Sequence, residues 1–315
     1  MRVIITGGTG FIGSRLANDL AAEGHDVIVL SRSPALAEGL AKQVRIEGWD
    51  AKTAHGWGHL VNGADAIVNL VGANLAGEGF FPSRWTDERK QVIIDSRVNT
   101  GKAVVEAIEQ AESKPSVLVQ ASASGYYGPH PFDVDITEES PPGDDWLARL
   151  CQQWEASTEV AEQMGVRRVV TRSGAVLSFE DGALQRLALP YQIFVGGPMG
   201  SGKQPFAWVH PADEIGAIKF LIRNAEASGP FNVATPNPTT NAQFGRALGQ
   251  VMSRPSLIPL PGFALNLMFG EVSTVVLEGQ KMLPTRLQAL GYEFKFPEAE
   301  AALRDLYRKP DSARA

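Results

Sequence analysis

Short apolar runs alternate with longer amphipathic patterns through the first half of the chain. Amphipathic stretches predict helices over residues 14–23, 98–111 and 146–164. The runs between them are rich in β-branched residues and predict strands over residues 2–6, 26–30, 66–71, 117–121 and 168–172. Strands that are apolar throughout and separated by helices are typical of a parallel sheet covered on both faces. We therefore predict an α/β fold with a doubly wound parallel sheet.

A glycine-rich loop follows the first predicted strand and precedes the first predicted helix. Its spacing is Gly7-x-x-Gly10-x-x-Gly13. Glycine at these positions lets the chain turn tightly and lets the backbone approach a pyrophosphate, which then lies on the positive end of the helix dipole. A plain glycine turn is the alternative, but the strand–loop–helix context favours a dinucleotide site of the Rossmann type.

The residues after the second predicted strand indicate which dinucleotide binds. An NAD site usually places an acid there, on the ribose 2′-hydroxyl, whereas this chain has Ser31 and Arg32. A hydroxyl and a guanidinium suit a 2′-phosphate, because arginine forms charge-assisted hydrogen bonds to phosphate oxygens. The alternative is that Arg32 is only a solvated loop residue. We predict NADP(H) as the cofactor.

The pattern becomes irregular after the last predicted strand, with glycine and proline clustered at residues 196–198 and 255–261. Ligands of doubly wound folds bind at the carboxyl ends of the strands, beside such an added part. We predict a dinucleotide-binding Rossmann domain over residues 1–175. A smaller C-terminal α/β domain over residues 176–315 would cover the substrate.

Composition excludes several classes of function. Apolar residues make up 44% of the chain, which argues against disorder, and the net charge of −6 argues against a nucleic-acid partner. A single cysteine, Cys151, allows no disulfide within the chain, and the five histidines show no metal-ligand spacing, so we expect no metal. No apolar run is long enough to span a membrane or to resemble a signal peptide, so we expect a cytoplasmic protein. The oligomeric state stays open.

The residues from Thr6 to Gly13 resemble the start of the extended short-chain dehydrogenase/reductase superfamily. Further matches are Asn69-Leu70-Val71-Gly72, Val98-Asn99-Thr100-Gly101 and Trp208-Val209-His210-Pro211. Arg84-Trp85, Ser96-Arg97 and Gly125-Tyr126-Tyr127-Gly128 are similar to an atypical epimerase-like subgroup with a C-terminal domain of unknown function. The resemblance implies a small-molecule substrate, with a nucleotide-sugar as one candidate. Together with the glycine loop and the pair at Ser31, it implies cofactor contacts from Gly7, Thr9, Gly10, Phe11, Ile12, Gly13, Ser31, Arg32, Asp50, Leu70, Gly72 and Asn99.

One departure from the superfamily concerns catalysis. The superfamily uses a tyrosine and a lysine four residues apart on a helix, but the matching positions hold Leu147 and Cys151. Tyr127 and Ser124, in the loop after the predicted strand 117–121, are the candidate catalytic residues in their place. Two functions stay open: an NADP(H)-dependent, epimerase-like oxidoreductase, and a non-catalytic NADPH-binding regulatory or sensor protein. A third, nucleotide hydrolysis at the P-loop-like residues 197–203, is disfavoured because Gln204 replaces the required hydroxyl residue.

We expect Arg32→Ala to weaken NADPH binding by roughly tenfold or more and NADH binding little, because only NADPH carries the 2′-phosphate. Fluorescence titration of the variant and the unaltered protein with each dinucleotide measures both affinities. Equal losses for the two cofactors would contradict the assignment of Arg32.

Overall fold

The computed structural model describes residues 1–77, 79, 82–179 and 182–308. Within these residues, seven parallel strands form a central sheet in the order β11-β7-β5-β4-β1-β2-β3. In chain order they are β1 (Arg2–Thr6), β2 (Asp26–Ser31), β3 (Arg45–Gly48), β4 (Ala66–Asn69), β5 (Val117–Ala123), β7 (Arg167–Ser173) and β11 (Gly229–Val233). The predicted doubly wound fold is confirmed, and every predicted strand is present.

The sequence pattern missed the two edge strands. β3 is exposed or half-buried throughout, and β11 contains a glycine and a proline, so neither shows the continuous apolar run of a buried strand. β11 lies beyond residue 175 yet pairs with β7. The central sheet therefore takes strands from both sides of the predicted domain boundary, and the division of the chain at residue 175 stays a prediction.

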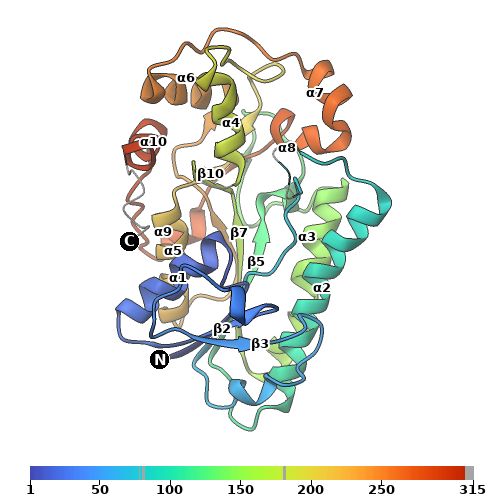
Figure 1. Ribbon diagram of the computed structural model, residues 1–315, viewed down its shortest axis with the longest axis vertical. Helices are drawn as coiled ribbons and strands as arrows, with labels where there is room; N and C mark the ends of the chain where they lie inside the picture. Colours follow the sequence, from blue (N-terminus) through green and yellow to red (C-terminus); the bar gives the residue numbers. More distant parts are fainter. Residues whose placement is uncertain (78, 80–81, 180–181, 309–315) are drawn as a thin grey trace.

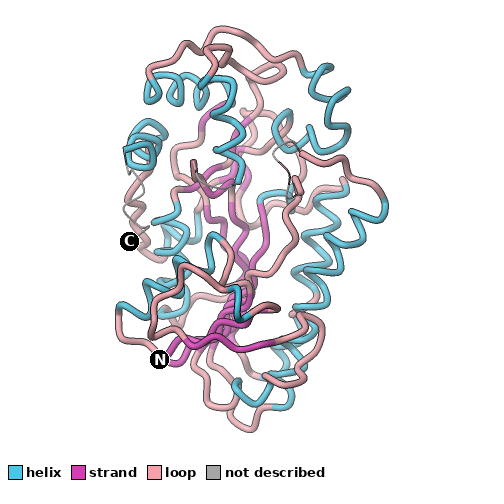
Figure 2. The backbone as a smooth tube through the Cα atoms, viewed as in Figure 1, coloured by secondary structure: helices cyan, strands magenta, loops and turns pink. Residues whose placement is uncertain are grey.

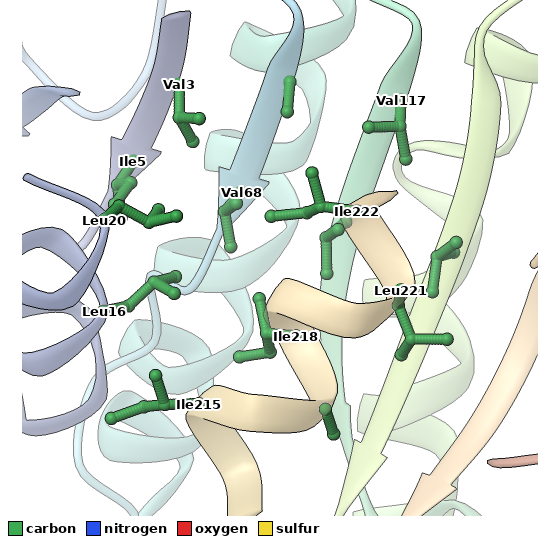
Figure 3. Close-up of a cluster of buried hydrophobic side chains, with 14 of the residues drawn as sticks. Val3, Ile5, Leu16, Leu20, Val68, Val117, Ile215, Ile218, Leu221 and Ile222 are labelled. Carbon is green, nitrogen blue, oxygen red and sulfur yellow. The ribbon is translucent and has the colours of Figure 1, made fainter. Parts of the chain in front are cut away.

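Helices cover both faces of the sheet (Figure 1). On one face, α1 (Phe11–Ala22) and α5 (Pro211–Arg223) pack apolar side chains against the strands. Figure 3 shows this cluster, in which Leu16 and Leu20 of α1 and Ile218 of α5 face Val68 of the sheet. Such burial contributes roughly 1.5–3 kcal/mol for each large apolar side chain.

The opposite face is covered by α2 (Asp87–Gln110) and α3 (Trp146–Ala156). α2 begins at Asp87 rather than near residue 98, because the Thr86 side chain caps it by accepting a hydrogen bond from the amide of Arg89. The amphipathic pattern predicted as one helix over 146–164 divides into α3 and a 3₁₀ helix.

The remaining elements gather mainly beyond one end of the sheet, where Figure 1 shows α4, α6 and α7 and Figure 2 shows long loops between helices. A second core, centred on Trp208 and Phe244, holds this region together. The further helices are α4 (Gly182–Gln192), α6 (Asn241–Met252), α7 (Gly262–Phe269), α8 (Thr274–Leu277), α9 (Thr285–Ala289) and α10 (Ala299–Arg308). The 3₁₀ helices are η1 (Pro34–Leu36), η2 (Gly58–Val61), η3 (Ser124–Tyr127), η4 (Glu159–Met164) and η5 (Gly270–Ser273). Two-residue strands are β6 (Asp135–Ile136), β8 (Ala175–Val176), β9 (Pro205–Phe206), β10 (Trp208–Val209), β12 (Thr239–Thr240) and β13 (Lys281–Met282).

No helix in the described part of the chain is long and apolar enough to cross a membrane.

We expect Gly101→Ala to destabilise the fold where α2 crosses the end of α3. A Cβ on Gly101 would lie 1.9 Å from Oγ and 2.8 Å from Cβ of Ser157, so the helices would have to separate. Overpacking of this kind costs about 1–3 kcal/mol of unfolding free energy, measured by urea denaturation. Lys102→Ala, at the exposed neighbouring position on the same helix, is the control, and equal stability of the two variants would contradict the prediction.

Candidate functional site

The turn from β1 into α1 forms a cradle that only glycine fits. Gly7 has a φ of +69°, and a Cβ on it would lie 3.1 Å from the backbone atoms of Leu70 and Val71. A Cβ on Gly13 would lie 2.3 Å from the carbonyl oxygen of Gly7. The first turn of α1 holds no acidic residue, and its N-cap, Gly10, offers no side chain to the amides. The helix amides and dipole therefore remain available to a phosphate.

A pocket of about 220 Å³ opens above this cradle. It lies at the carboxyl ends of β1, β2 and β4, where cofactors of doubly wound folds bind. Seven of the predicted cofactor contacts line it together: Gly7, Thr9, Gly10, Ser31, Arg32, Leu70 and Gly72. The structure adds four lining residues that the sequence analysis missed, Leu30, Trp49, Ala51 and Val71.

Ser31 is the last residue of β2, Arg32 follows it, and both line the pocket. The Ser31 hydroxyl oxygen accepts a hydrogen bond from the amide of Ser33 at 3.1 Å, so its own proton can be donated to a ligand. The Arg32 side chain is exposed and forms no ion pair with any described residue. A hydroxyl donor beside an unpaired guanidinium fits a 2′-phosphate.

The other predicted cofactor contacts lie outside the lining of this pocket. Phe11, Ile12 and Gly13 form the first turn of α1, and Asn99 is half-buried on α2. Asp50 is exposed, and its carboxylate accepts hydrogen bonds from the amides of Lys52 and Thr53, which lower its pKa. In this structure Asp50 caps a turn. The cofactor contacts of these residues stay predictions.

A second cavity of about 250 Å³ lies at the carboxyl ends of β5 and β7. α3 forms one wall, and the segments around β9 and α8 form another. Leu147 and Cys151 of α3 both line it, so the positions where the superfamily carries its tyrosine and lysine do face the cavity. Burial raises the pKa of the Cys151 thiol to about 12, so it stays protonated at neutral pH.

Ser122, within β5, and Ser124, directly after it, have different surroundings. Ser124 lines the cavity and forms no hydrogen bond with another described side chain, so its hydroxyl is available to a substrate. Ala123, at the strict position of the superfamily's serine or threonine, also lines the cavity. Ser122 instead donates its hydroxyl proton to Oε1 of Glu155 at 2.7 Å.

Tyr127 lies outside the cavity lining and is fully buried. Its hydroxyl donates to Oδ1 of Asn232 at 2.6 Å and accepts from Nη1 of Arg172 at 3.0 Å. Burial raises the pKa of Tyr127 to about 12. The structure thus brings Ser124 to the cavity and holds Tyr127 behind it, and a catalytic role for Tyr127 stays a prediction.

A buried ion pair connects these residues. Arg172, 4% exposed on β7, donates from Nε and Nη2 to the two carboxylate oxygens of Glu155 on α3, each at 2.9 Å. Its guanidinium also stacks on the Tyr126 ring, 3.4 Å from the ring centre. This pair was not predicted from the sequence. An arginine inside an apolar strand was the available signal, because a buried charge requires a partner.

The profile of the NAD-dependent epimerase/dehydratase family matches residues 3–234. The chain belongs to this family. A domain of unknown function, DUF1731, matches residues 260–306, within the C-terminal part of the resemblance described above. The family membership, the glycine cradle and the parallel sheet together establish an NAD(P)-binding fold of the extended short-chain dehydrogenase/reductase type.

Relatives cover nearly the whole chain. An epimerase family protein of Staphylococcus aureus (strain MRSA252), SAR0825, is 40% identical over 97% of this chain and 99% of its own. A chloroplastic homolog of epimerase family protein SDR39U1 from Arabidopsis thaliana is 41% identical over 96% of this chain and 86% of its own.

Two solved structures with more than 30% sequence identity to this chain have the same fold. Human epimerase family protein SDR39U1 (isoform 2), solved with NADPH, is 35% identical with a TM-score of 0.86, covering 97% of this chain and 99% of that one. A nucleoside-diphosphate sugar epimerase from Corynebacterium glutamicum is 31% identical with a TM-score of 0.75; the match covers 97% of this chain but 58% of that one.

Among the described residues, no group of three or more histidine, cysteine, aspartate or glutamate side chains could hold a metal ion. One acid beside the cavity is nevertheless unusual. Glu214, in the first turn of α5, is 1% exposed and accepts a hydrogen bond from the hydroxyl of Ser173, a residue of the cavity lining, at 2.7 Å. Burial raises the pKa of Glu214 to about 7.

We expect Glu214→Gln to stabilise the protein at pH 8 relative to its effect at pH 5. The pKa of Glu214 is about 7 in the folded protein and 4.5 in the unfolded chain. The unfolded chain therefore loses this proton first, and the free energy of unfolding falls as pH rises from about 4.5 to about 7. The difference would reach about 3 kcal/mol at most. Urea denaturation of both proteins at the two pH values measures it, with exposed Glu226→Gln as control. A pH-independent difference would contradict the burial of an ionisable Glu214.

Proposed function

We propose that the protein is an NADP(H)-dependent, epimerase-like oxidoreductase that acts on a small molecule in the 250 Å³ cavity. The main support for the proposal is that the cofactor pocket and the cavity adjoin each other. Gly72 lines the cofactor pocket, and a Cβ on it would lie 2.8 Å from Cζ of Arg97, which lines the cavity. A dinucleotide extending from the glycine cradle past Gly72 would reach the substrate there.

NADP(H) is favoured over NAD(H) by the pair at the end of β2. Ser31 and Arg32 offer a hydroxyl proton and a guanidinium at the pocket wall, and no acid occupies either position. NADPH in the structure of the human relative supports the same choice.

NADP(H), when bound, would supply hydride exchange between the nicotinamide and a substrate carbon. The substrate oxygen would exchange its proton with solvent through the Ser124 hydroxyl. Ser124 would hydrogen-bond that oxygen, because its hydroxyl is unengaged and faces the cavity. Leu147 and its apolar neighbours would exclude water from the reacting carbon. Tyr127 is better placed as a positioning residue, since its hydroxyl is held between Arg172 and Asn232.

The substrate class is a further part of the proposal. The resemblance implies a nucleotide-sugar as one candidate, and the Corynebacterium glutamicum relative is named a nucleoside-diphosphate sugar epimerase. The expected cytoplasmic location stays a prediction.

A non-catalytic NADPH-binding regulator is the second candidate function. The observation favouring it is that Leu147 and Cys151 face the cavity where the superfamily exchanges a proton, and the Cys151 thiol does not ionise near neutral pH. Such a protein would bind NADPH without turnover.

The two functions separate in one assay with Ser124→Ala. The unaltered protein is incubated with NADPH or NADP⁺ and a panel of nucleotide-sugars and small carbonyl and hydroxyl compounds, while nicotinamide absorbance and products are followed. We expect Ser124→Ala to lower the turnover rate roughly 100-fold and to leave the NADPH affinity unchanged. Loss of a side chain that takes part in proton transfer commonly lowers the rate by about this factor. Ser116→Ala, exposed at the opposite end of β5, should behave like the unaltered protein.

Tight NADPH binding with no turnover across the panel would favour the regulator. Loss of NADPH binding in Ser124→Ala would contradict its place on the substrate side.

A further inference from the structure

We infer that Arg97 binds the anionic group of the substrate, and that the cavity takes a small carboxylate with an apolar body rather than a nucleoside diphosphate. The inference rests on the proposed function, because it names the substrate class of the same cavity.

Arg97 is a buried cation, and two of its three guanidinium nitrogens donate no hydrogen bond to any described residue. It lies on α2, is 8% exposed and lines the cavity. Nη1 donates to the carbonyl oxygens of Ala73 and Ile93, both at 3.1 Å, and the guanidinium lies over the Trp154 ring, 4.9 Å from its centre. Nε and Nη2 form no hydrogen bond with any described residue.

A buried charge without a counter-charge is costly. Arg172, the other cation buried to this degree in the described part of the chain, is paired with Glu155. No carboxylate within the described ranges pairs with Arg97. Burial lowers the pKa of Arg97 to about 10, so it remains charged at neutral pH. A bound anion would supply the missing partner.

The guanidinium is placed where the reaction would occur. It adjoins Gly72 of the cofactor pocket on one side and the cavity wall carrying Cys151 on the other. Nε and Nη2 together form the two-donor edge that binds both oxygens of a carboxylate. A carboxylate bound there would place the adjoining carbon beside the cofactor pocket.

The rest of the cavity argues against a diphosphate. Arg97 is the one cation among the described lining residues, whereas two carboxylates, Asp145 and Glu278, also line it. These acids repel each other, since burial and then Asp145 raise the pKa of Glu278. A pyrophosphate would bring two more negative charges against them. The other walls are mostly apolar, with Leu147, Leu150 and Phe206 among them, and a volume of 250 Å³ suits a compact ligand.

The test compares an acid with its neutral analogue. Titration calorimetry of the protein saturated with NADP⁺ uses 4-methyl-2-oxopentanoate, its primary amide and UDP-glucose as probes. We expect the acid to bind 10- to 100-fold more tightly than the amide, the worth of a charge-assisted contact. UDP-glucose should bind more weakly than the acid.

Three variants locate the contact. Arg97→Met should bind acid and amide equally, and Arg97→Lys should keep part of the preference for the acid. Lys102→Met removes a positive charge from an exposed position of the same helix outside the cavity lining, and should keep the full preference. NADPH affinity and thermal unfolding, measured for each variant, show whether the fold is intact; if Arg97→Met unfolds, the comparison in the unaltered protein and in Arg97→Lys decides.

Equal binding of acid and amide to the unaltered protein, no binding of the acid, or tighter binding of UDP-glucose would each overturn the inference. Failure of the unaltered protein to bind NADPH would instead overturn the proposed function, so the two failures are distinguishable.

Discussion

The walls of the candidate active site depend on one buried ion pair, Arg172 with Glu155. Both charges are removed from water, so each needs the other, and breaking a buried pair of this kind typically costs about 3–5 kcal/mol. The pair joins β7 to α3, and Arg172 further holds Tyr126 by stacking and Tyr127 by a hydrogen bond. The loop carrying Ser124 and the helix carrying Cys151 are thereby fixed relative to each other, and both line the cavity.

The same polar network reaches the C-terminal region. The side-chain oxygen of Asn232, on β11, accepts a hydrogen bond from the hydroxyl of Tyr127. The backbone amide of Asn232 donates a hydrogen bond to the carboxylate of Glu138 at 3.0 Å. Glu138 in turn accepts the hydroxyl proton of Thr285 on α9. A chain of buried hydrogen bonds thus runs from α3 across the sheet to α9. Since buried polar groups cannot be left unpaired without penalty, the network sets how the C-terminal region sits on the sheet.

The protein keeps the cofactor geometry of its family and changes the chemistry beside it. The glycine cradle, the uncapped α1 terminus and the basic end of β2 fit a dinucleotide phosphate. Leu147 and Cys151 occupy the cavity wall without offering a proton at neutral pH. Arg97 supplies the positive charge on that side, from a different helix. A cavity with a fixed cation and mostly apolar walls suits a ligand that carries its own negative charge.

The parallel sheet, the glycine cradle and the basic residue after β2 follow from the sequence alone. They depend on local spacing: strand period, helix period and the conformational freedom of Gly7. The sequence also shows that Leu147 and Cys151 stand where the superfamily has its tyrosine and lysine. Packing in three dimensions buries Tyr127 behind the cavity, where its hydroxyl meets Asn232, and pairs Glu155 with Arg172. These outcomes join residues far apart in the chain, and burial and pairing at such distances follow from packing, which no local pattern specifies.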